Sequence, residues 1–381
     1  MSTDDEDRIR PVRRPTRPGV VEVARAAGVA PSTVSNVYNR PHAVSAALRE
    51  RVLNAATDLG YAGADPAGRN LREGRTNAIG IVMRERLAYS FEDAAAVQLM
   101  QGFSDAADPE QLAMVIVPAN PETATSAGPA VSRVAVDGFL VYSLVGDDPL
   151  IDAVRRRALP TVVVDSPAPD SAAANEFDFV GIDEQQPSQA AMHHLLSLGH
   201  RRVAVLSTRL SAQDLPGLAD LLSQAAATAS VATGRLQGAA AAVAAAGLSW
   251  AAVPVVQCPI SSIEQGRIGA HALLAAAPAT TAVFAFSDPL ALGARIAARE
   301  RGLAVPGQLS IIGFDDSAPT SEGLSTVHQP LRAKGRVATE RLLAALSGNR
   351  PTEPLLLPTR LVVRGSTGPP LARGARTAQP V

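Results

Sequence analysis

The chain has 381 residues, which is longer than one ordinary domain and predicts two or three. Hydrophobic residues make up 46% of it and charged residues 19%, so the chain can bury a sizeable core and is not disordered throughout. Its 35 basic and 36 acidic residues leave a net charge of -1, which excludes a uniformly basic nucleic-acid coat protein and an acidic solvating protein.

Residues 1–18 are expected to form a disordered arm, because acidic residues and then arginines and prolines follow one another without an apolar run. Since nothing there resembles the apolar core of a signal peptide, we expect a cytoplasmic protein. The one cysteine, Cys258, has no partner for a disulfide, a zinc site or a redox motif. His193, His194 and His200 follow a helix-and-turn pattern, so we expect neither a metal nor a cofactor.

Positive charge is concentrated near the start of the chain. Residues 8–75 contain 12 arginines and 5 acidic residues, a net charge of +7 that the near-neutral total conceals. Lys334 is the only lysine, so nearly every cation is a guanidinium, the group that forms forked contacts with phosphate and guanine. Because an arginine bias also follows from genomic base composition, the location of this charge is stronger evidence than its identity.

Residues 19–62 are expected to form three short helices. The stretch VARAAGVAPSTVSNV within them fits a helix-turn-helix, because alanines stand where the helices meet, a glycine turns the chain, and a proline suits the first helical position. Its valines would be buried, Pro31, Ser32 and Asn36 would face outward, and Thr33 and Ser35 would lie near phosphate. By spacing alone, DNA binding and an alanine-rich helical hairpin without DNA both stay open.

Residues 63–76 are polar and rich in glycine and alanine, which indicates a linker. Beyond them, apolar runs such as AIGIVM, VDGFLVY and LSIIGFDD alternate with amphipathic segments such as PLIDAVRRRAL. This alternation is typical of parallel sheets covered on both faces by helices. Nine such units exceed one usual sheet, so we expect two subdomains with a ligand site between them, at the carboxyl ends of the strands.

The stretch EVARAAGVAPSTVSNVYNRPHAVSAALRERVLNAATDLGY resembles the DNA-binding headpiece of the LacI family of bacterial transcriptional regulators. The resemblance continues through PAGRNLREGRTNAIGIV, which is similar to the hinge and first strand of that family, and through GHRRVAVL, GRLQG, SDPLALGARIAARERGLAVP and STVHQP to about Gly365. It implies a small all-α helix-turn-helix domain followed by an α/β periplasmic-binding-protein-like sensor of two doubly wound subdomains.

The resemblance also sets the expected boundaries. The helix-turn-helix domain would span 19–62, the hinge 63–76 and the sensor 77–366, with a tail at 367–381. Because the chain of this family crosses between the subdomains three times, the first subdomain would comprise about 77–182 and 328–352. The second would comprise about 183–326 and 353–366.

In this family the second helix of the headpiece lies in the major groove, so the resemblance implies base contacts from Pro31, Ser32 and Asn36. Ala30 stands where a serine is usual, and the missing capping hydroxyl costs about 1 kcal/mol of helix stability. Asn36 stands where arginine is common. Because asparagine suits adenine and arginine suits guanine, we expect a different preferred base at that position.

The hinge stretch PAGRNL corresponds to a short helix that forms on operator DNA and enters the minor groove, which adds Ala67 and Leu71 to the expected DNA contacts. Leu71 matches a leucine that the family wedges between the central base pairs, and an ordinary linker leucine is the alternative. Gly68 stands where alanine is usual and costs about 1 kcal/mol in a helix, so this hinge is expected to fold less readily.

In the sensor, Arg235 and Asp315 match ligand-binding residues on opposite walls of the family's cleft. A guanidinium donates to hydroxyl, carbonyl or carboxylate oxygens and a carboxylate accepts from hydroxyls, although a structural ion pair is the alternative. Weaker candidates stand after predicted strands and are equally compatible with turn or capping roles. They are Tyr89, Phe91, Ser143, Asp183 and Ser287.

Aromatic residues are only 3% of the chain, so few are available to stack on a purine. Ala229 and Val231 also stand where a purine-sensing relative has polar contacts, which favours a sugar or related polyol and leaves a purine or nucleoside as the alternative. We expect a ligand-responsive repressor, not an enzyme, that binds a pseudo-palindromic operator in double-stranded DNA as a homodimer. A solute-binding protein of the same sensor fold would instead have a signal peptide and no headpiece.

Overall fold

The computed structural model describes residues 18–61, 63, 74–83, 87–118, 124–146, 148–172, 175–211, 216–317, 323–351 and 353–371. Its chain divides into two compact units, Met1–Thr76 and Asn77–Val381. The expected N-terminal arm up to residue 17, the hinge residues Ala67 and Leu71, and the tail from residue 372 lie outside the described residues.

The first unit contains the headpiece, by which we mean residues 18–61. It consists of α1 (Val20–Ala27), α2 (Pro31–Asn39), the 3-10 helix η1 (Pro41–Ala43) and α3 (Ala46–Asp58), so the expected three helices are present. Gly28 ends α1 in the left-handed conformation at φ 63°, where a side chain would be strained. The buried core is made of small residues, which lets three short helices pack closely: Val23, Ala24, Ala27, Val34, Val37, Val52 and Ala56.

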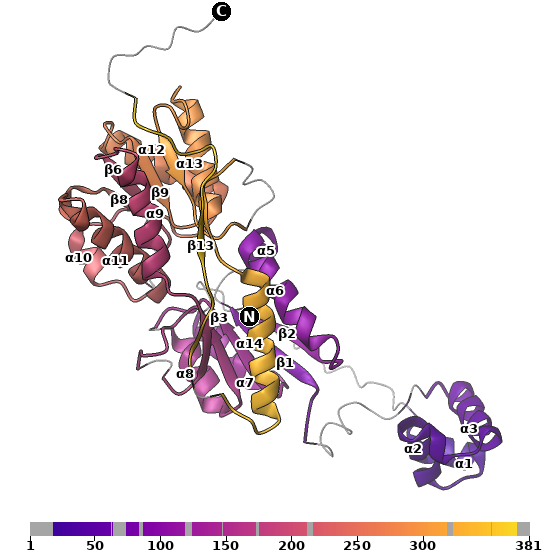
Figure 1. The fold of residues 1–381 in the computed structure, drawn as a ribbon. Helices are drawn as coiled ribbons and strands as arrows, with labels where there is room; N and C mark the ends of the chain where they lie inside the picture. Colours follow the sequence, from indigo (N-terminus) through magenta and orange to yellow (C-terminus); the bar gives the residue numbers. More distant parts are fainter. Residues whose placement is uncertain are drawn as a thin grey trace, which may run out of the picture. The chain divides into compact units, whose positions relative to one another are not determined.

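The second unit begins with a six-stranded, parallel sheet. Its order is β12-β5-β4-β3-β1-β2, a doubly wound order whose direction reverses between β1 and β3. Helices α6 and α14 pack on one face, where Figure 1 shows them side by side, and α7 and α8 pack on the other. The elements are β1 (Ala78–Met83), α5 (Leu87–Glu92), α6 (Ala94–Ala107), β2 (Ala113–Pro118), α7 (Ala124–Arg133), β3 (Gly138–Tyr142), α8 (Pro149–Arg157), β4 (Thr161–Val164), β5 (Asp178–Gly181), α14 (Leu331–Leu346) and β12 (Leu355–Leu356).

A second, five-stranded sheet has the order β10-β9-β6-β8-β7, with only β7 antiparallel to its neighbour. Helices α9 and α11 cover one face and α12 and α13 the other, so this sheet is also doubly wound (Figure 1). The elements are α9 (Gln185–Ser197), β6 (Val203–Ser207), β7 (Gly217–Leu218), α10 (Leu221–Ala225), α11 (Ser230–Ala245), η3 (Trp250–Ala252), β8 (Val255–Gln257), α12 (Ile263–Ala276), β9 (Ala282–Ala285), α13 (Asp288–Glu300) and β10 (Ser310–Ile312).

The chain passes between the two subdomains after β5, after β11 (Thr326–His328) and before β13 (Arg360–Val362). The last crossing differs from the expected boundary at 352/353, because β12 still pairs with β5 in the first sheet. The expected tail also begins too early at 367. The Gly368 carbonyl accepts hydrogen bonds from His200 Nε2 at 2.9 Å and from Ser310 Oγ at 2.9 Å, which fixes the chain against the second sheet.

Within the part of the chain that the structure describes, no helix is both long and apolar enough to cross a membrane. The apolar stretch between Gly238 and Val256 is divided among the end of α11, a turn at Gly247, η3 and β8.

Glycines let three pairs of helices approach at backbone distance. A Cβ atom built on Gly102 of α6 would lie 2.0 Å from the Arg332 carbonyl oxygen of α14. The same crowding occurs between α11 and α9 at Gly238, where the nearest atom is 2.1 Å away, and between α13 and α12 at Gly293, where it is 2.2 Å away. Each helix pair therefore depends on glycine where the helices cross, and Gly335 of α14 and Gly266 of α12 are equally crowded on the facing helices.

The variant Gly102→Ala is expected to lower the free energy of unfolding by about 1–3 kcal/mol, because α6 and α14 must move apart to admit the methyl group. Gly128→Ala is the matched control, since Gly128 also lies within a helix but a Cβ there meets nothing within 4 Å. Because Gly128 directly precedes Pro129, the gain in helix propensity is offset by the steric restriction before proline, and the control is expected to change the free energy of unfolding by less than about 1 kcal/mol. Equal stabilities of the two variants in urea unfolding would contradict the close approach.

Candidate functional site

The second helix of the headpiece has one buried and one exposed face. Val34 and Val37 are buried, whereas Pro31, Ser32 and Asn36 are exposed and Thr33 and Ser35 are half-buried. Pro31 occupies the first turn as expected, and the N-cap residue Ala30 provides no side-chain hydrogen bond. The polar side chains that the sequence assigned to DNA thus lie on the face that the headpiece core leaves free.

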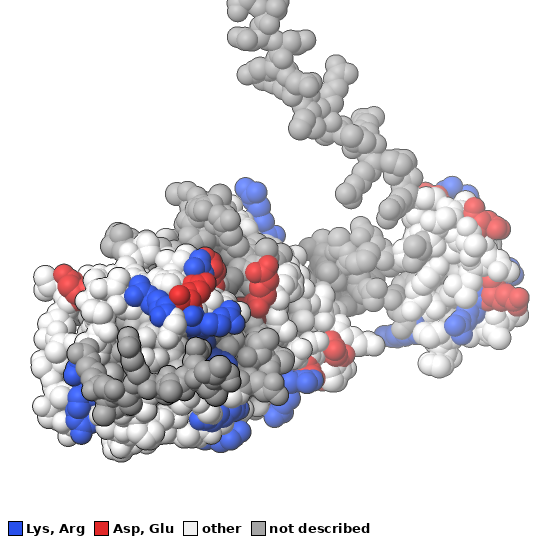
Figure 2. All heavy atoms as spheres, turned by 90° about the horizontal axis from the view of Figure 1, so that it is seen from above, with Lys and Arg blue, Asp and Glu red and all other residues white. Residues whose placement is uncertain are grey.

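The described headpiece is close to neutral. Its basic residues Arg25, Arg40, Arg49 and Arg51 are nearly balanced by Glu22, Glu50 and Asp58. On the face of the molecule that Figure 2 shows, basic and acidic side chains are interspersed, without a large patch of one sign. Most of the 12 arginines in residues 8–75 therefore belong to the segments on either side of the headpiece.

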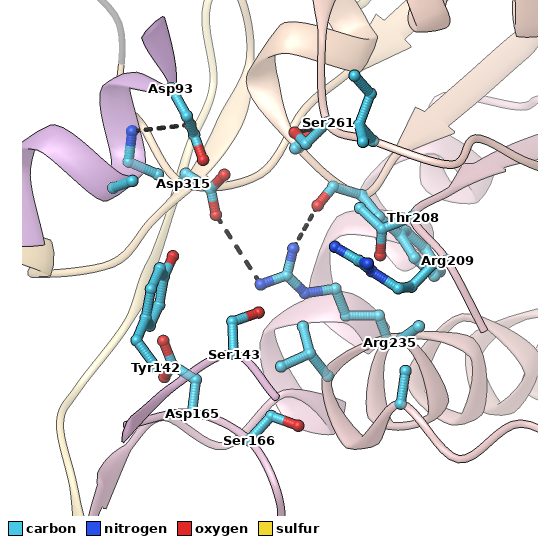
Figure 3. Close-up of a pocket in the computed structure, with 18 of the residues that line it drawn as sticks. Asp93, Tyr142, Ser143, Asp165, Ser166, Thr208, Arg209, Arg235, Ser261 and Asp315 are labelled. Carbon is cyan, nitrogen blue, oxygen red and sulfur yellow. Dashed lines mark hydrogen bonds and ion pairs between the residues drawn. The ribbon is translucent and has the colours of Figure 1, made fainter. Parts of the chain in front are cut away.

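A pocket in the second unit lies at the carboxyl ends of the central strands of both sheets. Met83 and Tyr142 end β1 and β3, where the order of the first sheet reverses, and both line the pocket. Thr208 and Phe286 follow β6 and β9, the corresponding position in the second sheet. Open α/β sheets bind ligands at such reversals, so this pocket, called the cleft below, is the candidate ligand site (Figure 3).

Arg235 lies in the first half of α11 with only 5% of its surface exposed. Its Nε donates to Glu184 Oε2 at 2.7 Å, Nη2 lies 3.8 Å from Asp315 Oδ1, and Nη1 donates to the Phe286 carbonyl oxygen. The guanidinium also stacks on the Phe314 ring, 3.6 Å from its centroid. Burial alone would lower the pKa of Arg235, but the two carboxylates outweigh it and raise that pKa.

Asp315 faces the guanidinium of Arg235 (Figure 3). Its backbone has a conformation that an L residue rarely adopts, with φ at 109°. Its Oδ1 accepts a hydrogen bond of 2.6 Å from Gln329 Nε2. Burial raises the pKa of its carboxyl group well above the usual value, although Arg235 opposes this. Ser143 and Asp165, at φ 55° and 65°, also line the cleft, so three of the described non-glycine residues with positive φ lie there.

The single lysine of the chain supports the cleft from behind. Lys334 Nζ is fully buried in α14 and donates to both carboxylate oxygens of Asp165, at 2.6 and 2.8 Å. It also donates to Gln329 Oε1, while the amide nitrogen of the same Gln329 side chain donates to Asp315. An uninterrupted series of contacts therefore runs from the second subdomain to the first. Its members are Glu184, Arg235, Asp315, Gln329, Lys334 and Asp165.

Two further hydrogen bonds join the subdomains directly, each without an intermediate residue. Ser230 Oγ, at the start of α11, donates to Ser166 Oγ after β4 at 2.8 Å. Gln98 Nε2 of α6 donates to the Ser317 carbonyl oxygen at 2.5 Å. The cleft is therefore flanked by contacts that would break if the subdomains moved apart.

Asp93 caps the N-terminus of α6 and lines the cleft with its carboxylate, whose Oδ1 accepts from the Ala95 amide at 3.1 Å. Burial raises its pKa to about 6, although the backbone amides of Ala95 and Ala96 act in the opposite direction. No described residue forms an ion pair with it. With a pKa of about 6, the carboxyl group of Asp93 takes up a proton at a higher pH than an ordinary aspartate does.

Asp93→Asn is expected to raise the free energy of unfolding by about 1–3 kcal/mol at pH 7.5, because asparagine keeps the cap but carries no buried charge. The folded-state pKa of about 6 exceeds the usual 3.8, so protonation stabilises the folded protein, fully so below about pH 4. The gain from the variant should therefore disappear as pH falls from 6 to 4. Asp105→Asn on the same helix is the control. It is expected to lower the free energy of unfolding, because Arg332 stabilises the charged form of Asp105 and lowers its pKa. A pH-independent gain would contradict the assignment.

The cleft brings together four of the seven residues that the sequence assigned to the ligand: Arg235, Asp315, Ser143 and Ser287. Ser287 also caps α13 and accepts a hydrogen bond from Ser261 Oγ at 2.5 Å. The Phe91 ring does not line the cleft, because it lies on the outer face of α5 and is 60% exposed. Asp183 is absent from the lining as well, because its Oδ1 accepts the Gln185 and Gln186 amides and so caps α9. The side chain of Tyr89 lies outside the described residues.

The other charged residues at the cleft were not predicted from the sequence. Glu184 is next to the expected Asp183, and only the direction of the chain at the crossing decides which of the two faces Arg235. Asp93 lies in the first strand-to-helix segment, where aromatic contacts were expected instead. The acid at position 93 directly before a helical pattern was the available signal, although it fits an ordinary cap equally well.

His194 and His200 form hydrogen bonds within the second subdomain. His200 Nδ1 is 2.9 Å from Thr281 Oγ1, and His194 Nε2 is 2.9 Å from Thr367 Oγ1. Within the described ranges, no group of three or more His, Cys, Asp or Glu side chains is arranged to hold a metal ion.

Two sequence families match the chain. Residues 20–63 match the family described as "Bacterial regulatory proteins, lacI family", and residues 192–367 match "Periplasmic binding protein-like domain". The HTH-type transcriptional regulator IpsA of Corynebacterium glutamicum is 36% identical over 85% of this chain and 90% of its own length. The HTH-type transcriptional regulator Rv3575c of Mycobacterium tuberculosis is 37% identical over 94% of this chain and 99% of its own length.

Solved structures agree with these matches. A LacI-family transcriptional regulator from Corynebacterium glutamicum superposes with a TM-score of 0.71 at 32% identity, covering 91% of this chain and 98% of the other. The transcriptional regulator CelR in complex with cellobiose superposes with a TM-score of 0.66 at 29% identity, covering 92% of this chain and all of the other. The two-part fold and the sequence thus point to one family.

Proposed function

Because the chain belongs to the LacI family of bacterial transcriptional regulators, we propose that it is a cytoplasmic repressor whose affinity for operator DNA is set by a small molecule in the cleft. The observation that carries the proposal is the position of the cleft at the strand-order reversals of two sheets, with Arg235 and Asp315 in its walls. Since its relatives are named as regulators and not as enzymes, binding and not turnover is the expected activity of this site.

Operator recognition is assigned to α2 and to the hinge. Pro31, Ser32 and Asn36 would contact base edges in the major groove, and Thr33 and Ser35 would contact phosphates. Ala67 and Leu71 would act in the minor groove, where a leucine wedge costs stacking energy that a bent operator returns through further contacts. Since one headpiece reads one half-site, a pseudo-palindromic operator requires a homodimer.

A sugar or related polyol is the effector class that fits the cleft best. Its lining supplies carboxylates, a guanidinium and the hydroxyls of Ser90, Ser143, Ser261 and Ser287, which match a ligand rich in hydroxyl groups. Ala229 and Val231 also line it and offer no polar contact to a nucleobase. The relative CelR was solved with cellobiose, which is a precedent for a sugar in this fold.

Effector control would act through the relation between the subdomains. A ligand that contacts both walls changes the free energy of the closed cleft, and it can shift DNA affinity only by its differential affinity for the two states. The contacts between Ser230 and Ser166 and between Gln98 and Ser317 are the ones that such a shift would make or break.

Genome-wide footprinting of the full-length protein tests the proposal, because it yields the operator and adjacent genes whose products indicate the effector. Binding to a recovered site should fall steeply with added salt, as expected for arginine contacts to phosphate. The expected operator is a pseudo-palindrome whose occupancy changes when a sugar or polyol is added. Absence of reproducible sites, or occupancy that no such compound alters, would contradict the proposal.

Asn36→Arg is expected to change the preferred base at one position in each half-site from adenine to guanine, a preference worth about 1–3 kcal/mol. Arginine donates two hydrogen bonds to guanine O6 and N7, whereas asparagine pairs with adenine N6 and N7. Selection from randomised duplexes measures the change, and Asn54→Arg on the exposed surface of α3 controls for added charge. The same consensus from parent and variant would show that Asn36 does not read that base.

A further inference from the structure

The charged groups of the cleft differ in how far protein partners already satisfy them. Each lining cation is engaged: Arg235 contacts two carboxylates, a carbonyl and an aromatic ring, and Arg209 has an interaction within the protein as well. Lys334 lies behind the lining and is neutralised by Asp165. A negatively charged ligand therefore meets no described cation in the cleft that lacks a partner.

Two carboxylates in the cleft accept hydrogen bonds but are less well neutralised by cations. Asp93 has no ion-pair partner among the described residues, and Asp315 shares Arg235, at 3.8 Å, with the closer Glu184. Figure 3 shows both carboxyl groups at the same end of the cleft, and the charge of Asp93 acts on Asp315. Asp93 belongs to the first subdomain and Asp315 to the second, so the two walls present acids to one another.

From this arrangement we infer that Asp93 and Asp315 bind hydroxyl groups of an uncharged sugar or sugar alcohol, and that the cleft excludes its phosphorylated or carboxylated forms. Each carboxylate accepts hydrogen bonds from hydroxyls, which a phosphate or carboxylate substituent cannot supply at neutral pH. A second anion beside two poorly compensated carboxylates is repelled, and burial strengthens the repulsion. The inference rests on the proposed function, and it names the effector class and two residues that select it.

A ligand held in this way also joins the subdomains. One hydroxyl group would donate to Asp93 on α6 and another to Asp315 after β10, so a single small molecule replaces the repulsion between the walls by a bridge. The closed cleft is then stabilised by the ligand and opposed by the same two acids when the ligand is absent. Asp93 thereby links the recognition of hydroxyl groups to closure.

The test is a thermal-shift and calorimetric screen of the full-length protein against sugars and sugar alcohols, each paired with its phosphate ester or its acid form. Uncharged members are expected to bind, and their charged partners to bind at least about tenfold more weakly. Asp93→Asn, which retains the α6 cap, is expected to weaken binding of the uncharged compound about tenfold and to reduce the discrimination. Asp105→Asn, on the exposed side of the same helix, should change neither.

Three results would overturn the inference. They are a phosphate ester or acid that binds at least as tightly as its uncharged partner, an uncharged ligand that Asp93→Asn binds unchanged, and a screen in which no uncharged compound binds. The first two leave effector control intact, because the ligand can still be tested for release of operator DNA. An uncharged ligand that binds through Asp93 but leaves operator affinity unchanged supports the inference and contradicts the proposed function.

Discussion

Arg235→Ala is expected to lower the free energy of unfolding by about 3–5 kcal/mol, because Glu184 and Asp315 would remain buried without their shared cation. The loss of the stacking contact with Phe314 and of the donor to the Phe286 carbonyl adds to the same effect. Urea unfolding of the separately purified variant measures it. Arg267→Ala is the matched control, since its ion pair with Glu264 lies at the surface and should contribute less than about 1 kcal/mol.

A second replacement separates lost charge from lost packing. Adding Glu184→Gln to Arg235→Ala removes one of the two uncompensated carboxylates, and it is expected to recover part of the lost stability. If Arg235→Ala were no more destabilising than the surface control, the guanidinium would not be what holds the buried acids together. If the double variant were less stable than Arg235→Ala, packing and not charge would account for the loss.

The same contacts bear on whether Arg235 binds ligand or only closes the cleft. Its guanidinium already has partners on the Glu184, Asp315 and Phe286 sides, so a ligand must share it or displace one of them. Arg235→Lys keeps the charge but lacks the planar fork, and thus distinguishes the roles. An effector whose stabilisation survives this change would bind through other groups, and Arg235 would then be an organiser of the two acids.

The strand and helix pattern was predictable because it is local. Each of the nine expected apolar runs coincides with a strand, since a parallel strand covered on both faces needs a continuous apolar segment. The short strands β7, β11, β12 and β13 were not predicted. A segment of two or three residues carries no periodicity of its own, and the equally short β8 and β10 were found only because each lies in a longer apolar run. The boundary at 352/353 failed for this reason, since it depended on recognising β12.

The cleft was predictable only in part, because its electrostatics depend on contacts distant in sequence. Arg235 and Asp315 were found through the family resemblance, but Lys334 meets Asp165 across 169 residues and no local pattern announces that pair. A lysine in the helical segment after STVHQP fits a solvated face as well as a buried site. Its singularity among 35 basic residues was the only signal, and composition alone does not assign a role to it.

The contacts of Gln329 connect the charged groups of the two walls of the cleft. This residue stands where the chain returns to the first subdomain, and its amide donates to Asp315 while its carbonyl accepts from Lys334. Rotation of the amide by half a turn would present like groups to both neighbours, so Asp315 and Lys334 together fix its orientation. A ligand that draws Asp315 away therefore also disturbs a group bound to the first subdomain, which gives the cleft a physical route between its walls.

Lys334→Met is expected to lower the free energy of unfolding by about 3 kcal/mol, because methionine fills the same space but leaves Asp165 buried without a cation. Gln329 would lose its donor at the same time, which releases the amide that holds Asp315. Arg332→Met on the same helix is the matched control. It breaks an exposed ion pair with Asp105 and is expected to cost less than about 1 kcal/mol.

Combining Lys334→Met with Asp165→Asn distinguishes an uncompensated charge from a poorly filled site. If the buried charge dominates, the double variant has no unpaired carboxylate and should be more stable than Lys334→Met alone, with a coupling energy of about 1–3 kcal/mol. Additive losses would instead mean that Asp165 is satisfied by water in the cleft and that Lys334 acts mainly by packing. Asp165 lines the cleft and Lys334 does not. Additive losses would therefore also mean that Lys334 has no part in effector binding, whereas strong coupling would mean that Lys334 positions the Asp165 carboxylate.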